Sequence, residues 1–293
     1  MSWQLQRQHW PYYRQLMRLD KPIGIYLLLW PTWWALWLAA EGIPPWSIWV
    51  VFTLGVVLMR SAGCVINDFA DRHLDGSVSR TQQRPLAAGH VTAPEALQLF
   101  AVLIALAATL LVWLNWQTVL LSFAAVALAA CYPFMKRYTH LPQVVLGAAF
   151  SWGMPMAFMA IQLQLPALVW WLYLANLCWT VAYDTYYAMV DQPDDEKIGI
   201  KSTAILFGRY GFAVIFCLQG ITLALLGYVG YLASLGWIFA LALLLSAVLF
   251  VYQNRLARRS RQHCFQAFLH NHYVGLVVFL GMALDYAAKS AGG

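Results

Sequence analysis

Two clusters of acidic residues stand out in a chain that is otherwise strongly apolar. Only 12 of the 293 residues are Asp or Glu, and eight of these 12 fall in two short segments. Carboxylate oxygens are the ligands that hard divalent cations such as Mg²⁺ prefer, so the clusters suggest cation chemistry. The first cluster holds Asp68, Asp71 and Asp75, and the second holds Asp184, Asp191, Asp194, Asp195 and Glu196.

Spacing within each cluster puts several of these residues on one helix face. Asn67, Asp71 and Asp75 are four residues apart and form the first ladder; Asp191 and Asp195 form the second ladder. An unpaired Asp near the bilayer centre costs roughly 2.5–3.5 kcal/mol, and like charges one helical turn apart repel each other. Mg²⁺ binds one or two carboxylates and keeps its other positions for water and phosphate oxygens. The two ladders together therefore predict a site for a diphosphate bridged by Mg²⁺.

The rest of the composition indicates an integral membrane protein. The chain is 62% hydrophobic and 10% charged, with a mean hydropathy of +0.62. A water-soluble globule of this size cannot bury so much apolar surface, and runs of the roughly 20 apolar residues that cross a bilayer recur along the sequence. We predict an all-α, polytopic membrane protein with nine transmembrane helices. The predicted spans are 23–40, 47–66, 96–114, 116–135, 144–161, 167–190, 212–232, 237–252 and 273–286.

The basic residues assign an orientation to these spans, because positively charged loops stay cytoplasmic. With nine spans and a cytoplasmic N-terminus, all of the 18 Lys and Arg residues except Arg60 and Lys289 fall in cytoplasmic segments. One missed helix would invert every later loop, so this partition supports the span count. Both ladders then lie on the cytoplasmic side. The net charge of +6 is spread over these loops, which argues against a nucleic-acid partner.

Residues 1–293 are expected to form a single transmembrane domain. Residues 1–22 are polar, basic and aromatic, which is typical of a segment that lies at the membrane interface. Its expected membrane anchors are Trp3, Trp10, Tyr12, Tyr13, Leu16 and Met17.

Basic residues near the ladders could supply the second half of an anion site. Arg72 follows the first ladder's Asp71, and Arg80 and Arg84 come later in the same loop. Lys136 and Arg137 close the fourth span, and Lys197 and Lys201 follow the second ladder. Each of these side chains could bind phosphate oxygens, and each could equally be an ordinary cytoplasmic loop charge.

Arg60 differs from these residues because it lies inside the second span. It precedes Asn67 by seven residues and therefore lies on nearly the same helix face, facing whatever cavity the first ladder borders. Its planar fork of donors could clamp a carboxylate. The alternatives are snorkelling to the interface or pairing with Asp68 or Asp71.

Longer motifs surround these residues. They read Asn67-Asp68-x-x-Asp71-x-x-x-Asp75, Arg80-Thr-x-x-Arg84-Pro85-Leu86-x-x-Gly89, Tyr132-Pro133-Phe-Met-Lys136-Arg137 and Asp191-x-x-x-Asp195. With these motifs the chain resembles the membrane-embedded aromatic prenyltransferases over essentially its full length. Residues 20–24, 136–143 and 198–204 resemble in particular the bacterial members that use 4-hydroxybenzoate.

This resemblance implies a fold, a location and a pathway. It implies nine helices around a central cavity that opens to the cytoplasmic side, with cap loops at 67–95 and 191–211. It also implies a multi-pass protein of the bacterial inner membrane that depends on Mg²⁺ and catalyses a step of ubiquinone biosynthesis. The implied partners are a polyprenyl diphosphate, 4-hydroxybenzoate and membrane lipid.

The resemblance also implies roles for the residues singled out above. Magnesium would be held by Asp71, Asp75, Asp191 and Asp195, with Asn67 in support, and Arg72, Lys136 and Lys201 would steady the diphosphate. Diphosphate departure would leave an allylic cation, which the ring carbon ortho to the phenol hydroxyl would attack. Arg60 and Arg137 are the candidates for the acceptor carboxylate, and Asp191 or a nearby water for the ring proton.

Other functions share part of this pattern. A lone pair of aspartates four residues apart is explained as well by a solvated helix end, but two such pairs on one membrane face are not. A divalent-cation transporter would need polar groups that reach the outer side, and the outward halves of the predicted spans offer almost none. Prenyltransferases for naphthoate or haem acceptors share the ladders and would differ only in the acceptor pocket.

Overall fold

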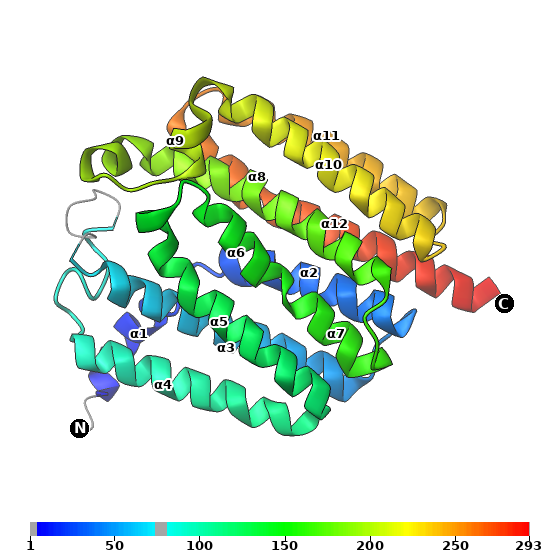
Figure 1. The fold of residues 1–293 in the computed structure, drawn as a ribbon, viewed down its shortest axis with the longest axis horizontal. Helices are drawn as coiled ribbons and strands as arrows, with labels where there is room; N and C mark the ends of the chain where they lie inside the picture. The colour runs from blue at the N-terminus through cyan, green and yellow to red at the C-terminus, as the bar shows by residue number, and fades with distance from the viewer. Residues whose placement is uncertain (1–4, 74–80, 293) are drawn as a thin grey trace.

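The computed structural model of this chain describes residues 5–73 and 81–292. The described residues contain helices and turns but no strand, which confirms the all-α prediction (Figure 1). The long helices run side by side along one direction, and the two termini lie at opposite ends of the molecule. The helices are α1 (Trp10–Leu16), α2 (Ile23–Ala40), α3 (Trp46–Asp71), α4 (Ala93–Leu110), α5 (Trp116–Tyr138), α6 (Pro142–Ser151), α7 (Gly153–Gln162), α8 (Ala167–Ile198), α9 (Thr203–Phe207), α10 (Gly211–Leu232), α11 (Trp237–Ala257) and α12 (Arg261–Gly292), with short 3₁₀ turns at Arg7–His9, Leu111–Trp113 and Gly208–Tyr210.

Eight segments of the described chain are long and apolar enough to cross a membrane. Each overlaps one of the predicted spans, and α6 and α7 together form one of them, Pro142–Gln162. The predicted span 167–190 is the first part of α8, a 32-residue helix that packs against α6, α10 and α12. Helix α8 carries Asn176, Thr180 and Asp184 among its apolar residues and is not one of these eight segments. The multi-pass membrane architecture is therefore clear, while the count of nine spans stays a prediction.

Local sequence explains where several helices begin. Thr92 and Glu95 form a capping box at the start of α4, in which each side chain bonds the other residue's backbone N–H. The side chain of Asn115 accepts a hydrogen bond from the backbone of Thr118 and caps α5. The predicted span 144–161 is divided near Trp152 into α6 and α7. These caps fix the starts of α4 and α5.

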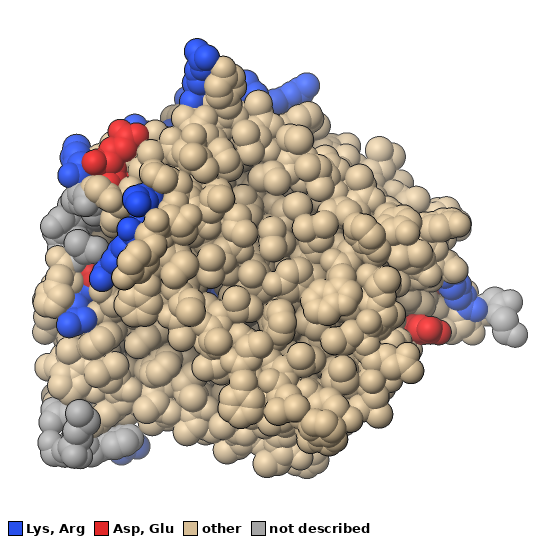
Figure 2. All heavy atoms as spheres, viewed as in Figure 1, with Lys and Arg blue, Asp and Glu red and all other residues tan. Residues whose placement is uncertain are grey.

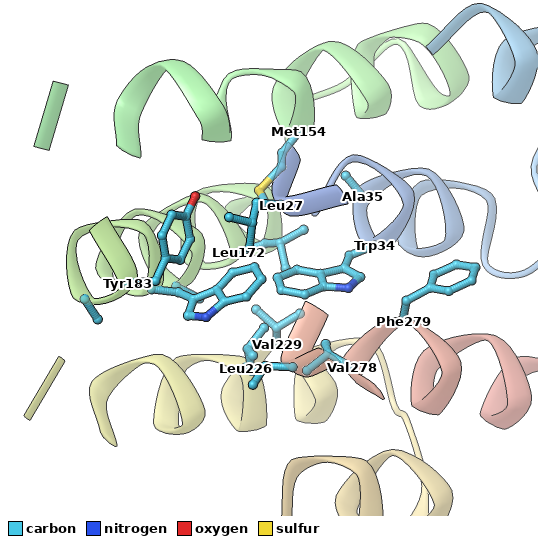
Figure 3. Packing of buried hydrophobic residues seen from close by; sticks show 14 of the residues in the cluster. Leu27, Trp34, Ala35, Met154, Leu172, Tyr183, Leu226, Val229, Val278 and Phe279 are labelled. Atoms are coloured by element: carbon cyan, nitrogen blue, oxygen red, sulfur yellow. The ribbon is translucent and has the colours of Figure 1, made fainter. Parts of the chain in front are cut away.

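The buried core lies where α2, α8, α10 and α12 meet (Figure 3). Trp34 and Trp179 are both almost fully buried, and their rings stack with centroids 5.3 Å apart. Their indole N–H groups donate to the Gly275 carbonyl (3.0 Å) and to Asn271 Oδ1 (2.8 Å). Both buried indole donors are thus satisfied within the protein.

Gly275 on α12 gives the first testable prediction. A Cβ at this position would lie 2.7 Å from Trp30 Cδ1 and 2.9 Å from Trp179 Cη2. Gly275→Ala should therefore push α12 from α2 and α8 and cost about 1–3 kcal/mol of stability. A melting curve of the purified protein should show a fall of several degrees. Gly220→Ala is the matched control, since nothing lies within 4 Å of its new Cβ; equal melting temperatures for both variants would contradict the packing argument.

The N-terminal segment is more deeply attached than an interfacial anchor. Trp10 is 56% exposed, as expected for an anchor, but Tyr13, Leu16 and Met17 are buried against α3 and α4. The expectation that these three residues contact the membrane is therefore wrong, because helix faces supplied by α3 and α4 cover them. Trp3 lies outside the described residues.

Candidate active site

A cavity of about 1280 Å³ lies between the helices, polar toward one end and apolar along much of its wall. The ends of α3 and α8 that carry the ladders lie at the same end of the molecule (Figure 1). The visible Lys, Arg, Asp and Glu atoms gather mainly at this end too, with few at the opposite end (Figure 2). Of the expected site residues, the cavity is lined by Arg60, Asn67, Asp71, Lys136, Asp191, Asp195 and Lys201.

The two ladders therefore face one chamber although they are more than 100 residues apart in the sequence. Asp71 is the last residue of α3, while Asp191 and Asp195 lie on the extended C-terminal part of α8. The cap loops expected at 67–95 and 191–211 thus begin with helix. Asp75 and Arg80 lie outside the described residues.

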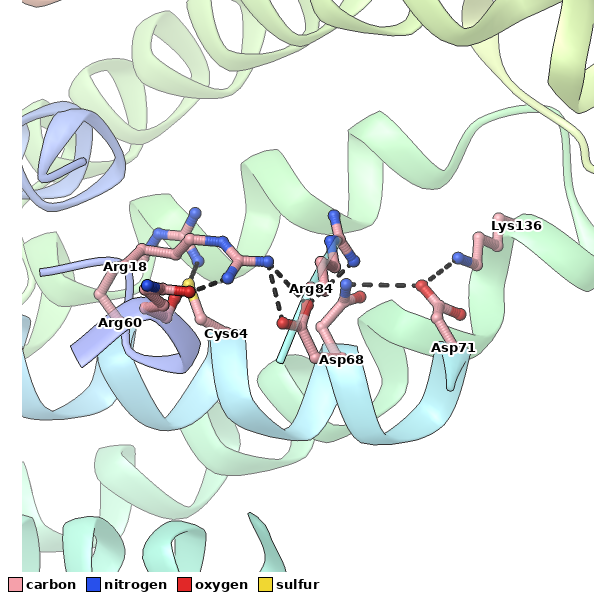
Figure 4. A network of polar contacts seen from close by, with 9 residues as sticks. Arg18, Arg60, Cys64, Asp68, Asp71, Arg84 and Lys136 are labelled. Atoms are coloured by element: carbon pink, nitrogen blue, oxygen red, sulfur yellow. Dashed lines mark hydrogen bonds and ion pairs between the residues drawn. The ribbon is translucent and has the colours of Figure 1, made fainter. Parts of the chain in front are cut away.

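The two carboxylate oxygens of Asp71 have different surroundings (Figure 4). The side chain is only 3% exposed, and its Oδ2 accepts from Asn67 Nδ2 at 3.4 Å and pairs with the Lys136 ammonium. Its Oδ1 is buried and accepts no hydrogen bond from any described residue. A buried carboxylate oxygen without a donor is costly unless a ligand satisfies it.

This donor set fits Mg²⁺ that is shared with a substrate. No three His, Cys, Asp or Glu side chains in the described part of the chain converge closely enough to hold an ion alone. Mg²⁺ commonly takes one or two carboxylates and completes its octahedron with water and phosphate oxygens. The unsatisfied Asp71 oxygen and the carboxylates of Asp191 and Asp195 across the cavity match that pattern.

The basic residues divide into two groups. Lys136 and Lys201 line the cavity, and the Lys201 backbone N–H donates to the Lys136 carbonyl at 3.0 Å, which joins α5 to the segment after α8. Arg72 and Arg137 do not line it: they donate to the carbonyls of Phe69 (2.7 Å) and Ala70 (3.3 Å) on α3. The structure therefore brings the two lysines, but neither of these arginines, to the expected site.

Asp68 makes contacts that its sequence position did not suggest (Figure 4). This side chain is 1% exposed, and it accepts hydrogen bonds from Arg18 at the end of α1 and from Arg84. Both arginines also line the cavity. In the sequence Arg18 is only one of the basic residues expected on the cytoplasmic side, and no local pattern reveals a partner 50 residues away.

Arg60 lies on the cavity wall between aromatic residues. Its Nη1 lies 2.7 Å from Cys64 Sγ, and its guanidinium carbon lies 5.8 Å from the centre of the Phe150 ring. Its Nε is buried and donates to no described residue. Asp68 and Asp71 are paired with other cations, so the alternative of an Arg60 ion pair with either of them is not what the structure shows.

Sequence reasoning missed the aromatic continuation of the second ladder. Tyr183 and Tyr187 precede Asp191 and Asp195 at intervals of four residues, and all four line the cavity. Tyr132 and Asp184 line it as well. The four-residue spacing was visible in the sequence, so extending the ladder toward the N-terminus of α8 would have found both tyrosines.

The chain is similar to known proteins in sequence and in fold. Residues 28–279 match the family described as the UbiA prenyltransferase family. A 4-hydroxybenzoate octaprenyltransferase of Chromohalobacter salexigens is 62% identical over 276 residues, covering 94% of this chain and 93% of that protein. The apo structure of a UbiA homolog from Aeropyrum pernix K1 has a TM-score of 0.79 at 25% identity, covering 89% of this chain and 97% of that one. A UbiA homolog from Archaeoglobus fulgidus bound to GPP and Mg²⁺ shares the fold, with a TM-score of 0.67 at 19% identity and coverage of 95% and 99%.

Proposed function

We propose that this chain, which belongs to the UbiA prenyltransferase family, transfers a polyprenyl group from polyprenyl diphosphate to 4-hydroxybenzoate. The observation that carries the proposal is the single cavity that joins carboxylates from α3 and α8 to a partly buried arginine. The similarity to a 4-hydroxybenzoate octaprenyltransferase supports this acceptor over naphthoate or haem. The product would be an intermediate of ubiquinone biosynthesis.

The polar end of the cavity would bind the diphosphate. Asp71, Asp191 and Asp195 would hold Mg²⁺, and Asp75 would complete the set from outside the described residues. When bound, Mg²⁺ neutralises the diphosphate and makes it a better leaving group. Asn67 bonds Asp71 Oδ2 and so orients the carboxylate, while Lys136 and Lys201 supply positive charge to the outer oxygens.

The aromatic and apolar walls would protect the reacting carbon and receive the tail. Tyr132, Tyr183 and Tyr187 line the cavity between the ladders and Arg60, where aromatic faces can stabilise an allylic cation and exclude water. Farther along, the wall is formed by apolar residues of α3, α4 and α5, such as Val56, Ile104 and Val126. This lining suits an isoprenoid chain.

The acceptor would bind with its carboxylate on Arg60 and its ring toward the diphosphate end. The ring carbon ortho to the hydroxyl bonds to the first carbon of the prenyl group, whose bond to the diphosphate oxygen breaks. The ring then loses the proton from that carbon to Asp191 or to a nearby water. Arg60 is a partly buried cation whose buried Nε donates to no described residue, which suits a fixed carboxylate.

We further propose that the active site faces the cytoplasm from the bacterial inner membrane. The ladder end of the molecule carries most of the visible charge (Figure 2), and positively charged ends of membrane proteins stay cytoplasmic.

One labelled-substrate experiment tests the proposed reaction. Membranes from cells that express the chain are incubated with radiolabelled 4-hydroxybenzoate, a polyprenyl diphosphate and Mg²⁺, and label is counted in a lipid extract. We expect label in the extract, its loss with EDTA and its return when excess Mg²⁺ is added. Absence of lipid-soluble label, with thermal stabilisation by the metal alone, would favour cation transport instead.

A further inference from the structure

We infer that Arg18 binds the diphosphate of the prenyl donor, and that Asp68 positions Arg18 and Arg84 rather than holding a metal ion. This inference rests on the proposed function, because it assigns residues to the donor subsite of that reaction. It also makes the N-terminal helix α1 part of the active site.

Helix α1 is fixed to the bundle by a buried polar contact. Glu95 on α4 is 1% exposed, and its Oε1 accepts from the Tyr13 hydroxyl and contacts His9 Nδ1, both at 2.7 Å. Leu16, one turn after Tyr13, is fully buried. These contacts hold α1 against α3 and α4 and leave its end beside the cavity.

The backbone turns sharply at the end of α1 and aims Arg18 at the cavity. Arg18 has a φ of 56°, in the left-handed region that few non-glycine residues adopt. Its Nη1 donates to the Gln15 carbonyl at 2.7 Å, and its Nη2 contacts both carboxylate oxygens of Asp68 at 2.9 Å. Local strain of this kind persists where surrounding contacts hold the residue in place.

The charges around Asp68 favour an anion. One buried carboxylate contacts two guanidinium groups, so the three side chains together carry a net positive charge beside the cavity. Both Asp68 oxygens already accept hydrogen bonds from arginine, which leaves Asp71 Oδ1 as the better metal ligand on α3. Arginine forks match phosphate oxygens well, and Asp68 pre-orients two of them.

Donor binding is the direct test, because it does not require turnover. The probe is a prenyl S-thiolodiphosphate, titrated calorimetrically into purified protein in Mg²⁺. Arg18→Ala should raise its Kd about 10- to 100-fold, the range expected for lost charge-assisted hydrogen bonds. Arg18→Gly should do the same while easing the positive φ. Arg14→Ala, an exposed arginine of α1 that does not line the cavity, is the control and should bind normally.

A second readout separates positioning from metal ligation. With the thiolodiphosphate saturating, Asp68→Asn and Arg18→Gly should leave the Mg²⁺ midpoint for thermal stabilisation within about twofold of wild type, whereas Asp71→Ala should shift it strongly. Normal thiolodiphosphate binding by both Arg18 variants would reduce Arg18 to an anchor of α1 and overturn the inference. A Mg²⁺ shift in Asp68→Asn equal to that of Asp71→Ala would overturn the role given to Asp68. Neither result touches the proposed function, which fails only if the wild type makes no prenylated product.

Discussion

Asp191→Ala is expected to reduce prenyl transfer by about 10³-fold or more, while Asp194→Ala, on the same helix, stays near the wild-type rate. Asp191 lines the cavity opposite Asp71, whereas Asp194 does not line it and contacts Lys197 at 3.5 Å on the surface. A metal-bridged diphosphate needs carboxylates from both helices, so losing one side should remove most of the leaving-group activation. If the cluster acted only through its total negative charge, the Asp191 and Asp194 variants would lose equal activity.

The measurement is kcat at saturating donor, acceptor and Mg²⁺ in purified protein, with melting curves for each variant. Asp191→Asn keeps the shape and removes the charge, and we expect it to be nearly as inactive as Asp191→Ala. Equal activity of the Asp191 and Asp194 variants would show that surface charge, not metal ligation, explains the second cluster. Full activity of Asp191→Ala would remove that residue from the metal site.

The meeting of the two ladders was predictable because it depends on features that a sequence carries. Four-residue spacing fixes a helix face, and the distribution of Lys and Arg fixes which end of each span is cytoplasmic. In the predicted topology both ladder helices run toward the cytoplasm, so their ends are expected to meet at one level. The sequence therefore predicts that Asp71, Asp191 and Asp195 line one cavity, as they do, without any knowledge of how the helices pack.

Arg72 and Arg137 were expected in the site but do not line the cavity, and helix geometry explains the difference. Each directly follows a residue that lines the cavity, Asp71 and Lys136, and successive residues of a helix point about 100° apart. Some neighbours do both line the cavity, as Tyr183 and Asp184 do, but these two arginines point away from it.

The contacts of Arg18 could not be predicted in the same way. They depend on the docking of α1 through Glu95, a residue 82 positions after Tyr13, and on a left-handed turn at a non-glycine residue. Neither the docking of α1 nor this turn leaves a periodic pattern in the sequence. The same holds for the burial of Tyr13, Leu16 and Met17, which look like interface anchors until α3 and α4 are placed over them.

Arg60→Ala should raise the KM for 4-hydroxybenzoate about 30-fold or more and change the KM for the prenyl diphosphate much less. The guanidinium lies on the cavity wall near Phe150, and Asp68 and Asp71 pair with other cations. Removing it would leave the acceptor carboxylate in an apolar pocket without a partner. Arg60→Lys keeps the charge but loses the planar fork, so an intermediate KM is expected.

Gly24 on α2 allows the position of Arg60 to be tested without changing its charge. A Cβ at Gly24 would lie 2.5 Å from both Nε and Nη2 of Arg60, so Gly24→Ala must displace the guanidinium. We expect its KM for 4-hydroxybenzoate to rise in the same direction as in Arg60→Ala, by a smaller factor because the flexible side chain can shift. Initial rates with each substrate varied in turn separate the two KM values. A larger change in the donor KM than in the acceptor KM for Arg60→Ala would move Arg60 to the diphosphate site, and an unchanged acceptor KM in both variants would mean that another cation holds the carboxylate.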